Sequence, residues 1–371
     1  VPATLAMVWL GTRLSTVLVF DAKLWGMLIL IYCFLASLTP VWALLQPRGY
    51  LGGFVLFLAI GLGIIGVFSG QYTIQQPAFK GWQAGLVPGT SAANTLFPFL
   101  FVTIACGACS GFHGLVCSGT TSKQIAKESH CHPVGYGAML AEGFVAFIAL
   151  VTIMMLSDER AKELAKPGII YGTGIGEFMT LIIGEQNRTF AIVFGAMAFS
   201  TFVFDTLDVC TRLGRYLIQE LTGWRTTMGS VGATLLTVIP AAFFVAAASK
   251  PDSYISFWTL FGASNQLLAA LTLLSITVWL YQARRRIAFT LLPMIFVLVT
   301  TLTALVKIVI GSFVPAEGQA LGLMGILNGI AALILVLLAL YLAVTALLRL
   351  KTERSGDLVL DAPGAPLPAA E

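Results

Sequence analysis

Long apolar segments recur along the chain and are separated by short polar stretches. Several of them are long enough to cross about 30 Å of hydrocarbon as helices. They lie at approximately 24–45, 51–69, 97–118, 135–156, 189–210, 231–249, 257–282, 287–311 and 321–348. Residues 1–20 form either the end of a further span or an interfacial helix. The pattern predicts an all-α, polytopic integral membrane protein with about nine to ten transmembrane helices.

Composition agrees with this interpretation, since 58% of the residues are hydrophobic and 10% are charged. Roughly 25% of the residues of a soluble domain are charged. The 6 cysteines have no spacing typical of a disulfide scaffold. A formal net charge of +4 gives no sign of a nucleic-acid partner, so the expected surroundings are the lipid bilayer. The chain starts at Val1 without a targeting segment, and residues 1–350 are therefore interpreted as an N-terminally incomplete transmembrane domain.

The short basic loops predict the orientation. Arg284, Arg285 and Arg286 share one side of the predicted membrane with Arg349 and Lys351, which places the C-terminus in the cytoplasm. Residues 351–371 are rich in Pro and Ala and are expected to be a disordered cytoplasmic tail.

Two long loops follow on the opposite side, at residues 70–96 and 157–188. The second begins SDERAKELAKPG, which predicts a short helix with Ser157 as its N-cap and a stop at Pro167. The sequence YGTGIGE at 171–177 superficially resembles a phosphate-binding loop. It follows no strand, so it is interpreted as a flexible connector.

The stretch 199–221 predicts a helix with one polar stripe, and its polar residues recur every three or four positions. The stripe consists of Thr201, Asp205, Asp208, Arg212, Arg215 and Gln219. Charges at membrane depth are expensive, so they are expected to face protein or a water-filled cavity. They form either a structural ladder, with Asp208 and Arg212 as an i to i+4 pair, or part of a path for substrate or ions.

The stretch 97–124 has an apolar start and then an unusual density of small and hydroxylated residues. These are Gly107, Ser110, Gly111, His113, Gly114, Ser118, Gly119, Thr120 and Thr121. They favour an interrupted helix, whose backbone must line a cavity or be buried in protein. The alternative is close helix packing through small residues. His113 is either a proton carrier or a packing residue.

Other candidates are weaker. Cys106, Cys109 and Cys117 lack a fourth ligand at a typical spacing, and the tripeptide His130-Cys131-His132 cannot close a tetrahedral site, so no metal and no cofactor are expected. The segment GASNQ places Asn265 and Gln266 just inside a span, where their amides suit either interhelical contacts or a carboxylate or amide ligand. Glu142 is a further acid within a span.

Three stretches, CGACSGFHGLVCSGTTSKQ, FDTLDVCTRLGRYLIQE and LFGASNQLLAALTLL, resemble the carbon starvation protein A (CstA) family of bacterial transporters. The resemblance runs from about Trp25, through ASLTPVWALLQPRGYL, to the last span. It implies a LeuT-like inverted-repeat bundle of the amino acid–polyamine–cation superfamily, and uptake of peptides or pyruvate. A family stretch of the type GHHFAAIAGAGP does not occur here, and Cys109, Cys117 and Ser122 depart from the family motif. The missing stretch indicates either a truncated chain or a degenerate member, and truncation is the favoured interpretation. The departures at the cysteines further weaken the idea of a metal site.

Together with the residues above, this resemblance implies a secondary transporter, not an enzyme. Its expected ligands are a small carboxylate or short peptide and a coupling proton or sodium ion, at the bacterial inner membrane. The alternative is a non-transporting membrane protein, such as a sensor of carbon starvation. Candidate substrate-binding residues are Ser110, Gly111, His113, Ser118, Thr120, Thr121, Arg212, Arg215, Asn265 and Gln266, and candidate ion-coupling residues are Asp205, Asp208 and Glu142.

Overall fold

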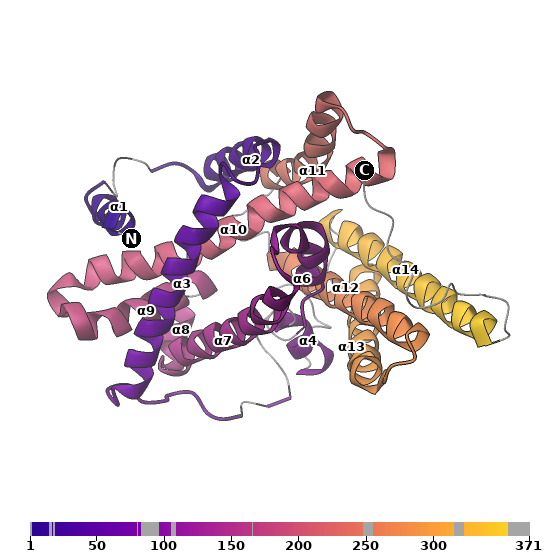
Figure 1. Ribbon diagram of the computed structural model, residues 1–371. Coiled ribbons are helices and arrows are strands. Elements are labelled where there is room, and N and C mark those ends of the chain that lie inside the picture. The colour runs from indigo at the N-terminus through magenta and orange to yellow at the C-terminus, as the bar shows by residue number, and fades with distance from the viewer. Residues whose placement is uncertain are drawn as a thin grey trace. The chain divides into compact units, whose positions relative to one another are not determined.

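The computed structural model of the chain is built from helices, and the residues it describes contain no strand (Figure 1). These residues are 2–14, 17, 19–79, 81–82, 96–104, 109–164, 166–247, 255–314 and 323–354. Within them, 7 helices are long and apolar enough to cross a membrane. They lie within Leu45–Phe68, Glu128–Met154, Glu185–Thr222, Thr227–Ala247, Trp258–Gln282, Ala288–Phe313 and Gly325–Ala346.

Two shorter apolar helices, Ala22–Leu38 and Pro167–Ile183, accompany these spans. Many large side chains of the long helices point outward, including Phe54 and Phe57 on one helix and Phe289 and Leu292 on another. Such faces are expected where helices meet lipid. The chain is therefore a polytopic membrane protein, whereas the count of nine to ten spans and the LeuT-like arrangement stay predictions.

The helices divide into two compact units. The first contains Val1–Lys80 and Leu115–Tyr254, and the second contains Gly81–Gly114 and Ile255–Glu371. The α-helices of the first unit are α1 (Pro2–Arg13), α2 (Ala22–Leu38), α3 (Leu45–Phe68), α7 (Ala138–Met154), α8 (Asp158–Leu164), α9 (Pro167–Ile183), α10 (Arg188–Thr222) and α11 (Thr227–Ala247).

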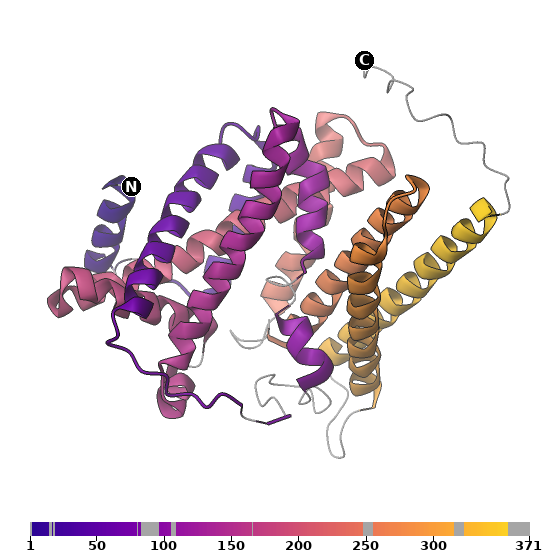
Figure 2. The ribbon, with the colours of Figure 1, turned by 60° about the horizontal axis from the view of Figure 1, so that its bottom comes forward.

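Helix α10 is the longest element of the first unit and contacts α2, α3, α9 and α11 (Figure 1). Helices α3 and α7 are neighbours, as Figure 2 shows. The core between α3, α7, α9 and α10 contains the fully buried side chains of Ile148, Ile175, Phe178 and Phe194. The expected helix over 199–221 is confirmed as the C-terminal part of α10.

The interpretation of residues 171–177 as a flexible connector is wrong, because they lie in the buried middle of α9. A Cβ atom on Gly172 would lie 2.9 Å from the backbone nitrogen of Ala196, and one on Gly176 would lie 2.8 Å from the Cα of Ile192. Glycine at these positions lets the backbones of α9 and α10 approach closely, as small residues do in membrane helix pairs. The glycine spacing thus reflects helix packing.

The short helix after Ser157 is confirmed as α8, and the Ser157 hydroxyl accepts a hydrogen bond from the Arg160 backbone N–H at 3.2 Å. The short helix ends at Leu164, before the expected stop at Pro167. Pro167 occupies the first turn of α9, where its missing N–H would have no helical partner.

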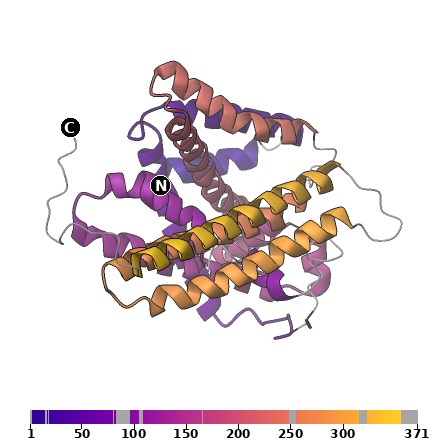
Figure 3. The same cartoon turned by 90° about the vertical axis from the view of Figure 1, so that its right-hand side faces the viewer.

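The second unit contains α4 (Leu96–Thr103), the start of α6 (Gly111–Val116), α12 (Ile255–Gln282), α13 (Ala288–Phe313) and α14 (Leu323–Arg354). Helices α13 and α14 lie side by side (Figure 3). The core of the second unit contains the fully buried side chains of Val102, Leu267 and Leu305, together with several alanines. Residues 355–371 lie outside the described residues, and so does Gly107.

The interrupted helix is confirmed, because α4 ends at Thr103 and α6 begins at Gly111 after the non-helical Cys109 and Ser110. Beyond α6 the chain continues as a π-helix, η1 (Cys117–Thr121). Three short helices, η2 (Ser122–Gln124), η3 (Glu128–His130) and η4 (Pro133–Gly137), then lead into α7, and η5 (Glu185–Asn187) precedes α10.

Candidate functional site

Arg48, at the start of α3, bridges the two acids of the polar stripe on α10. Its Nε lies 2.8 Å from Oδ1 of Asp205, and its Nη1 lies 2.5 Å from Oδ2 of Asp208. The Asp208 side chain is 4% exposed, and that of Asp205 is 30% exposed. A planar guanidinium can bind two carboxylates at once, so a single cation holds both acids.

Tyr32 on α2 completes this arrangement. Its hydroxyl donates a hydrogen bond to Oδ2 of Asp208 at 3.0 Å and accepts one from Nη1 of Arg48. Gly52, one helical turn after Arg48, is also required, because a Cβ atom there would collide with the Asp205 carboxylate. Three helices therefore position the two acids.

Two buried atoms of this arrangement, Nη2 of Arg48 and Oδ1 of Asp208, have no hydrogen-bond partner among the described residues. A buried polar atom without a partner costs about 1–3 kcal/mol, so each atom is poised to bind water, an ion or a ligand group. Oδ1 of Asp208 can accept a proton or bind a cation, and Nη2 of Arg48 can donate to an anion.

Arg212 and Arg215 form the next turns of the same stripe and are 4% and 8% exposed. Nη2 of Arg212 donates to the Ala36 carbonyl of α2 at 2.7 Å, and the guanidinium of Arg215 lies 4.8 Å from the ring centroid of Tyr216. The Nε atoms of both arginines are buried and have no hydrogen-bond partner in the part of the chain that the structure describes.

The predicted pair of Asp208 with Arg212 is replaced by the pair of Asp208 with Arg48, which comes from another helix. Among the described residues, no carboxylate forms a salt bridge with Arg212 or Arg215. We call Tyr32, Arg48, Asp205, Asp208, Arg212 and Arg215 the charge cluster.

An open recess with a volume of about 220 Å³ lies beside the last turns of α10. Nζ of Lys123 is 5.5 Å from the ring centroid of Tyr216, so this ring contacts both Lys123 and Arg215. Thr120 belongs to the π-helix η1, and such local irregularities are frequent at functional sites. The recess is lined by Val41, Trp42, Gln46, Gly119, Thr120, Lys123, Gln124 and Tyr216.

Other candidates in the first unit lie apart from these contacts. The Ser118 hydroxyl donates to the Leu115 carbonyl, Thr121 is half-buried in η1, and Glu142 is half-buried on α7. At the ends of the predicted stripe, Thr201 donates to the Met197 carbonyl of its own helix, and Gln219 donates to Ser230 of α11. Ser118, Thr201 and Gln219 thus have structural hydrogen bonds.

The second unit contains a site of a different kind, in which two adjacent amides of α12 hold the interrupted helix. Oδ1 of Asn265 accepts from the Phe112 N–H at 2.8 Å and from the Ser110 hydroxyl at 3.3 Å, at the start of α6. Nε2 of Gln266 donates to the Phe101 carbonyl of α4 at 2.5 Å. We call Asn265 and Gln266 the amide clamp, because they bind backbone on both sides of the break.

Gly111 is packed directly against α12, since a Cβ atom on it would collide with the backbone of Asn265 and Ala269. The glycine therefore allows the start of α6 to pack closely against α12. The His113 side chain is exposed on α6, and its backbone N–H is 3.4 Å from the Ser110 hydroxyl.

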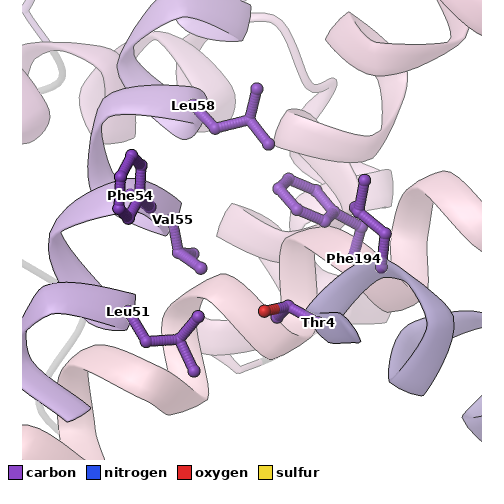
Figure 4. A pocket seen from close by; sticks show the side chains of 7 residues that line it. Thr4, Leu51, Phe54, Val55, Leu58 and Phe194 are labelled. Atoms are coloured by element: carbon purple, nitrogen blue, oxygen red, sulfur yellow. The ribbon is translucent and has the colours of Figure 1, made fainter. Parts of the chain in front are cut away.

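The described residues contain no group of three or more potential metal ligands. Cys109 and Cys117 are free thiols, and Cys106 lies outside the described residues. A second pocket, between α1, α3 and α10, is almost wholly apolar (Figure 4). Leu51, Phe54, Val55, Leu58 and Phe194 line it with Thr4, so it does not suit a charged ligand.

The sequence did not identify the residues that contact the polar side of α10 from other elements, which are Arg48, Tyr32 and Lys123. It also did not identify Tyr216 of α10, whose ring Lys123 contacts. Arg48 lies in the first turn of α3, directly before the apolar run of that helix. An arginine at the edge of a span was the signal that could have identified it.

Comparison with known proteins gives a consistent result. The family model described as Carbon starvation protein CstA matches residues 1–174 and 165–304. The chain is 32% identical over 332 residues to a protein named Peptide transporter CstA from Helicobacter pylori (strain ATCC 700392 / 26695), which covers 74% of this chain and 48% of that protein. No solved structure matches the chain significantly.

Two further relatives carry transporter names. Peptide transporter CstA from Bacillus subtilis (strain 168) is 30% identical over 384 residues, covering 90% of this chain and 62% of that protein. Pyruvate/proton symporter BtsT from Escherichia coli (strain K12) is 28% identical over 356 residues, covering 74% of this chain and 49% of that protein. The chain thus spans about half the length of most of these relatives.

Proposed function

The chain belongs to the carbon starvation protein CstA family, and on this premise we propose that it is a secondary active transporter. Its substrate is a small carboxylate or a short peptide, imported across the bacterial inner membrane with the C-terminus in the cytoplasm. A proton or sodium gradient drives the import. The names of the relatives, a peptide transporter and a pyruvate/proton symporter, support this substrate range.

The charge balance of the charge cluster and the adjoining recess is the observation that carries the proposal. Arg48, Arg212, Arg215 and Lys123 supply four cations, whereas Asp205 and Asp208 supply two carboxylates, and both of these pair with Arg48. Arg212 and Arg215 have only neutral partners in the Ala36 carbonyl and the Tyr216 ring, and no carboxylate of the described residues forms a salt bridge with either, so both can receive an anion from outside. The substrate carboxylate provides that anion.

The acids then couple transport to the gradient. A proton on Asp208, or a sodium ion at its unbonded Oδ1, weakens the attraction between this carboxylate and Arg48. Arg48 can then leave Asp208, and its Nη1 becomes available to the anion beside the unbonded Nη2. Binding of the cation and of the substrate carboxylate thereby favour one another, which is the requirement for symport.

The amide clamp has a supporting role in this proposal. Its oxygen and nitrogen atoms hold the two ends of the interrupted helix, and this fixes the local shape of α4 and α6. Nδ2 of Asn265 is buried without a partner among the described residues and stays a candidate donor to substrate.

The test is uptake by proteoliposomes that contain the reconstituted protein. Labelled pyruvate and labelled alanyl-alanine are offered separately, each with an imposed proton gradient, an imposed sodium gradient, or neither. We expect accumulation above the outside concentration for at least one substrate and one gradient. Binding of substrate without accumulation under any gradient would instead support a non-transporting sensor and would end the proposal.

A further inference from the structure

We propose that the recess beside α10 is a carboxylate-binding subsite, with Lys123 as the group that contacts the anion. The inference rests on the proposed function, because the anion is taken to be the carboxylate of the transported substrate. It goes further than the proposed function because it assigns the anion to the recess and to Lys123, which is not part of the polar stripe.

The first argument is electrostatic. Among the described residues no carboxylate forms a salt bridge with Lys123, and its ammonium instead lies over the Tyr216 ring. Arg215 approaches the same ring at 4.8 Å, so two cations share one aromatic partner. A cation–π contact at an exposed site stabilises weakly, and the flexible lysine can therefore leave the ring for an anion.

The second argument concerns the neutral groups beside Lys123. Nε2 of Gln46 donates to Oε1 of Gln124 at 3.3 Å, and Nε2 of Gln124 donates to the Thr120 carbonyl at 3.4 Å. These bonds fix both amides at the edge of the recess, while Oε1 of Gln46 accepts no hydrogen bond from the described residues. An amide oxygen next to a cation matches a ligand with a carboxylate and a nearby N–H or hydroxyl donor.

The third argument is continuity with the charge cluster. The Tyr216 ring contacts both Lys123 and the buried Arg215, and Arg212 lies one helical turn before Tyr216. An anion bound at Lys123 therefore has the buried arginines as its next cationic partners. The recess is accordingly an entry or exit subsite for the anion that the cluster requires.

The recess contains its own reporter, since Trp42 lines it and is 72% exposed. We would titrate the protein, in nanodiscs of neutral lipid, with pyruvate, alanyl-alanine and alanyl-alanine amide while recording tryptophan fluorescence. A Trp42→Phe variant identifies the part of the signal that arises in the recess. The amide probe lacks the carboxylate but keeps the rest of the dipeptide.

We expect a carboxylate ligand to change the Trp42 signal, and Lys123→Gln to weaken this binding about tenfold or more, as for a hydrogen bond to a charged group. The amide probe should bind Lys123→Gln and the parent protein equally. The control is Lys127→Gln, because Lys127 is an exposed lysine of the same loop that does not line the recess.

Equal carboxylate affinity in Lys123→Gln and the parent protein would overturn the subsite. So would a signal that requires anionic lipid in the nanodisc and ignores added carboxylate, because the anion would then be a lipid headgroup. Proteoliposome uptake separates the two proposals. If the parent protein accumulates substrate and Lys123→Gln has the same KM, only the subsite is wrong, whereas no accumulation by the parent protein contradicts the proposed function.

Discussion

The charge cluster and the amide clamp are both polar groups inside apolar helical units, yet their hydrogen bonding differs. The amide clamp binds backbone within its own unit, and Gln266 has a partner on each side because Thr301 donates to its Oε1 at 3.4 Å. Among the described residues, the clamp leaves one atom of a neutral amide, Nδ2 of Asn265, without a partner, whereas the charge cluster leaves four atoms of charged groups: Nη2 of Arg48, Oδ1 of Asp208 and the Nε atoms of Arg212 and Arg215.

This difference separates a structural polar site from a chemical one. Polar atoms that bind backbone stabilise one conformation, as Oδ1 of Asn265 and Nε2 of Gln266 do for the interrupted helix. Buried charged groups with unbonded atoms retain capacity for a ligand, and a transporter needs such capacity. The clamp should therefore respond to mutation through stability, and the cluster through ligand and ion binding as well. Four substitutions test this, in order of their expected effect on the free energy of unfolding.

Arg48→Gln should have the largest effect. It leaves the buried Asp208 carboxylate without its cation, and breaking a buried pair costs about 3–5 kcal/mol. We expect a strongly lowered midpoint of thermal unfolding in detergent and no gradient-driven uptake. Arg285→Gln, at an exposed loop arginine, is the control. If Arg48→Gln unfolds at the parental temperature, the cluster does not depend on this pair.

Gly111→Ala tests the close approach beneath the amide clamp. The added methyl group would collide with the backbone of Asn265 and Ala269, and overpacking of this kind costs about 1–3 kcal/mol. Gly143→Ala is the matched control, because nothing lies within 4 Å of a Cβ atom there. Alanine should stabilise that helical position by up to about 1 kcal/mol. The measurement is the midpoint of thermal unfolding of both variants. Equal midpoints would contradict the close packing of Gly111 against α12.

Gln266→Met removes the two hydrogen bonds that Gln266 makes in the clamp and nearly conserves volume. The Phe101 carbonyl and the Thr301 hydroxyl lose a partner, which should cost about 1 kcal/mol. Because the clamp is structural, the KM for substrate should stay within about twofold in the fraction that remains folded. The exposed Gln75→Met is the control. A large increase in KM without loss of stability would show that the amide contacts substrate.

The sequence allowed prediction of features that depend on local spacing. The stripe on α10 and the break before Gly111 both follow from residues that are near one another in the chain. Pairing between distant helices has no such local signal, and Arg48 is separated from Asp205 by 157 positions. The charge of Asp208 is therefore neutralised by a residue that the helical period could not identify. Likewise, the glycines of α9 indicated a loop until their packing against α10 was known.

Asp205→Asn should have the smallest effect on stability and is the sharpest test of the comparison. Asp205 is 30% exposed, and an asparagine can still accept a hydrogen bond from Nε of Arg48, while Asp208 keeps its ion pair. We expect the free energy of unfolding to fall by less than about 1 kcal/mol, as for partly exposed ion pairs.

The same variant should nevertheless lose gradient-driven accumulation, because the neutral side chain can no longer take up a proton or bind a sodium ion as a carboxylate. Counterflow exchange of substrate, which needs no gradient, should persist. Glu220→Gln provides the matched control, since Glu220 is an exposed acid on the same helix. Unchanged accumulation by Asp205→Asn would remove Asp205 from coupling. Asp208 would then be the one acid of the polar stripe still able to couple transport to the gradient, because its buried Oδ1 retains the capacity to bind a cation.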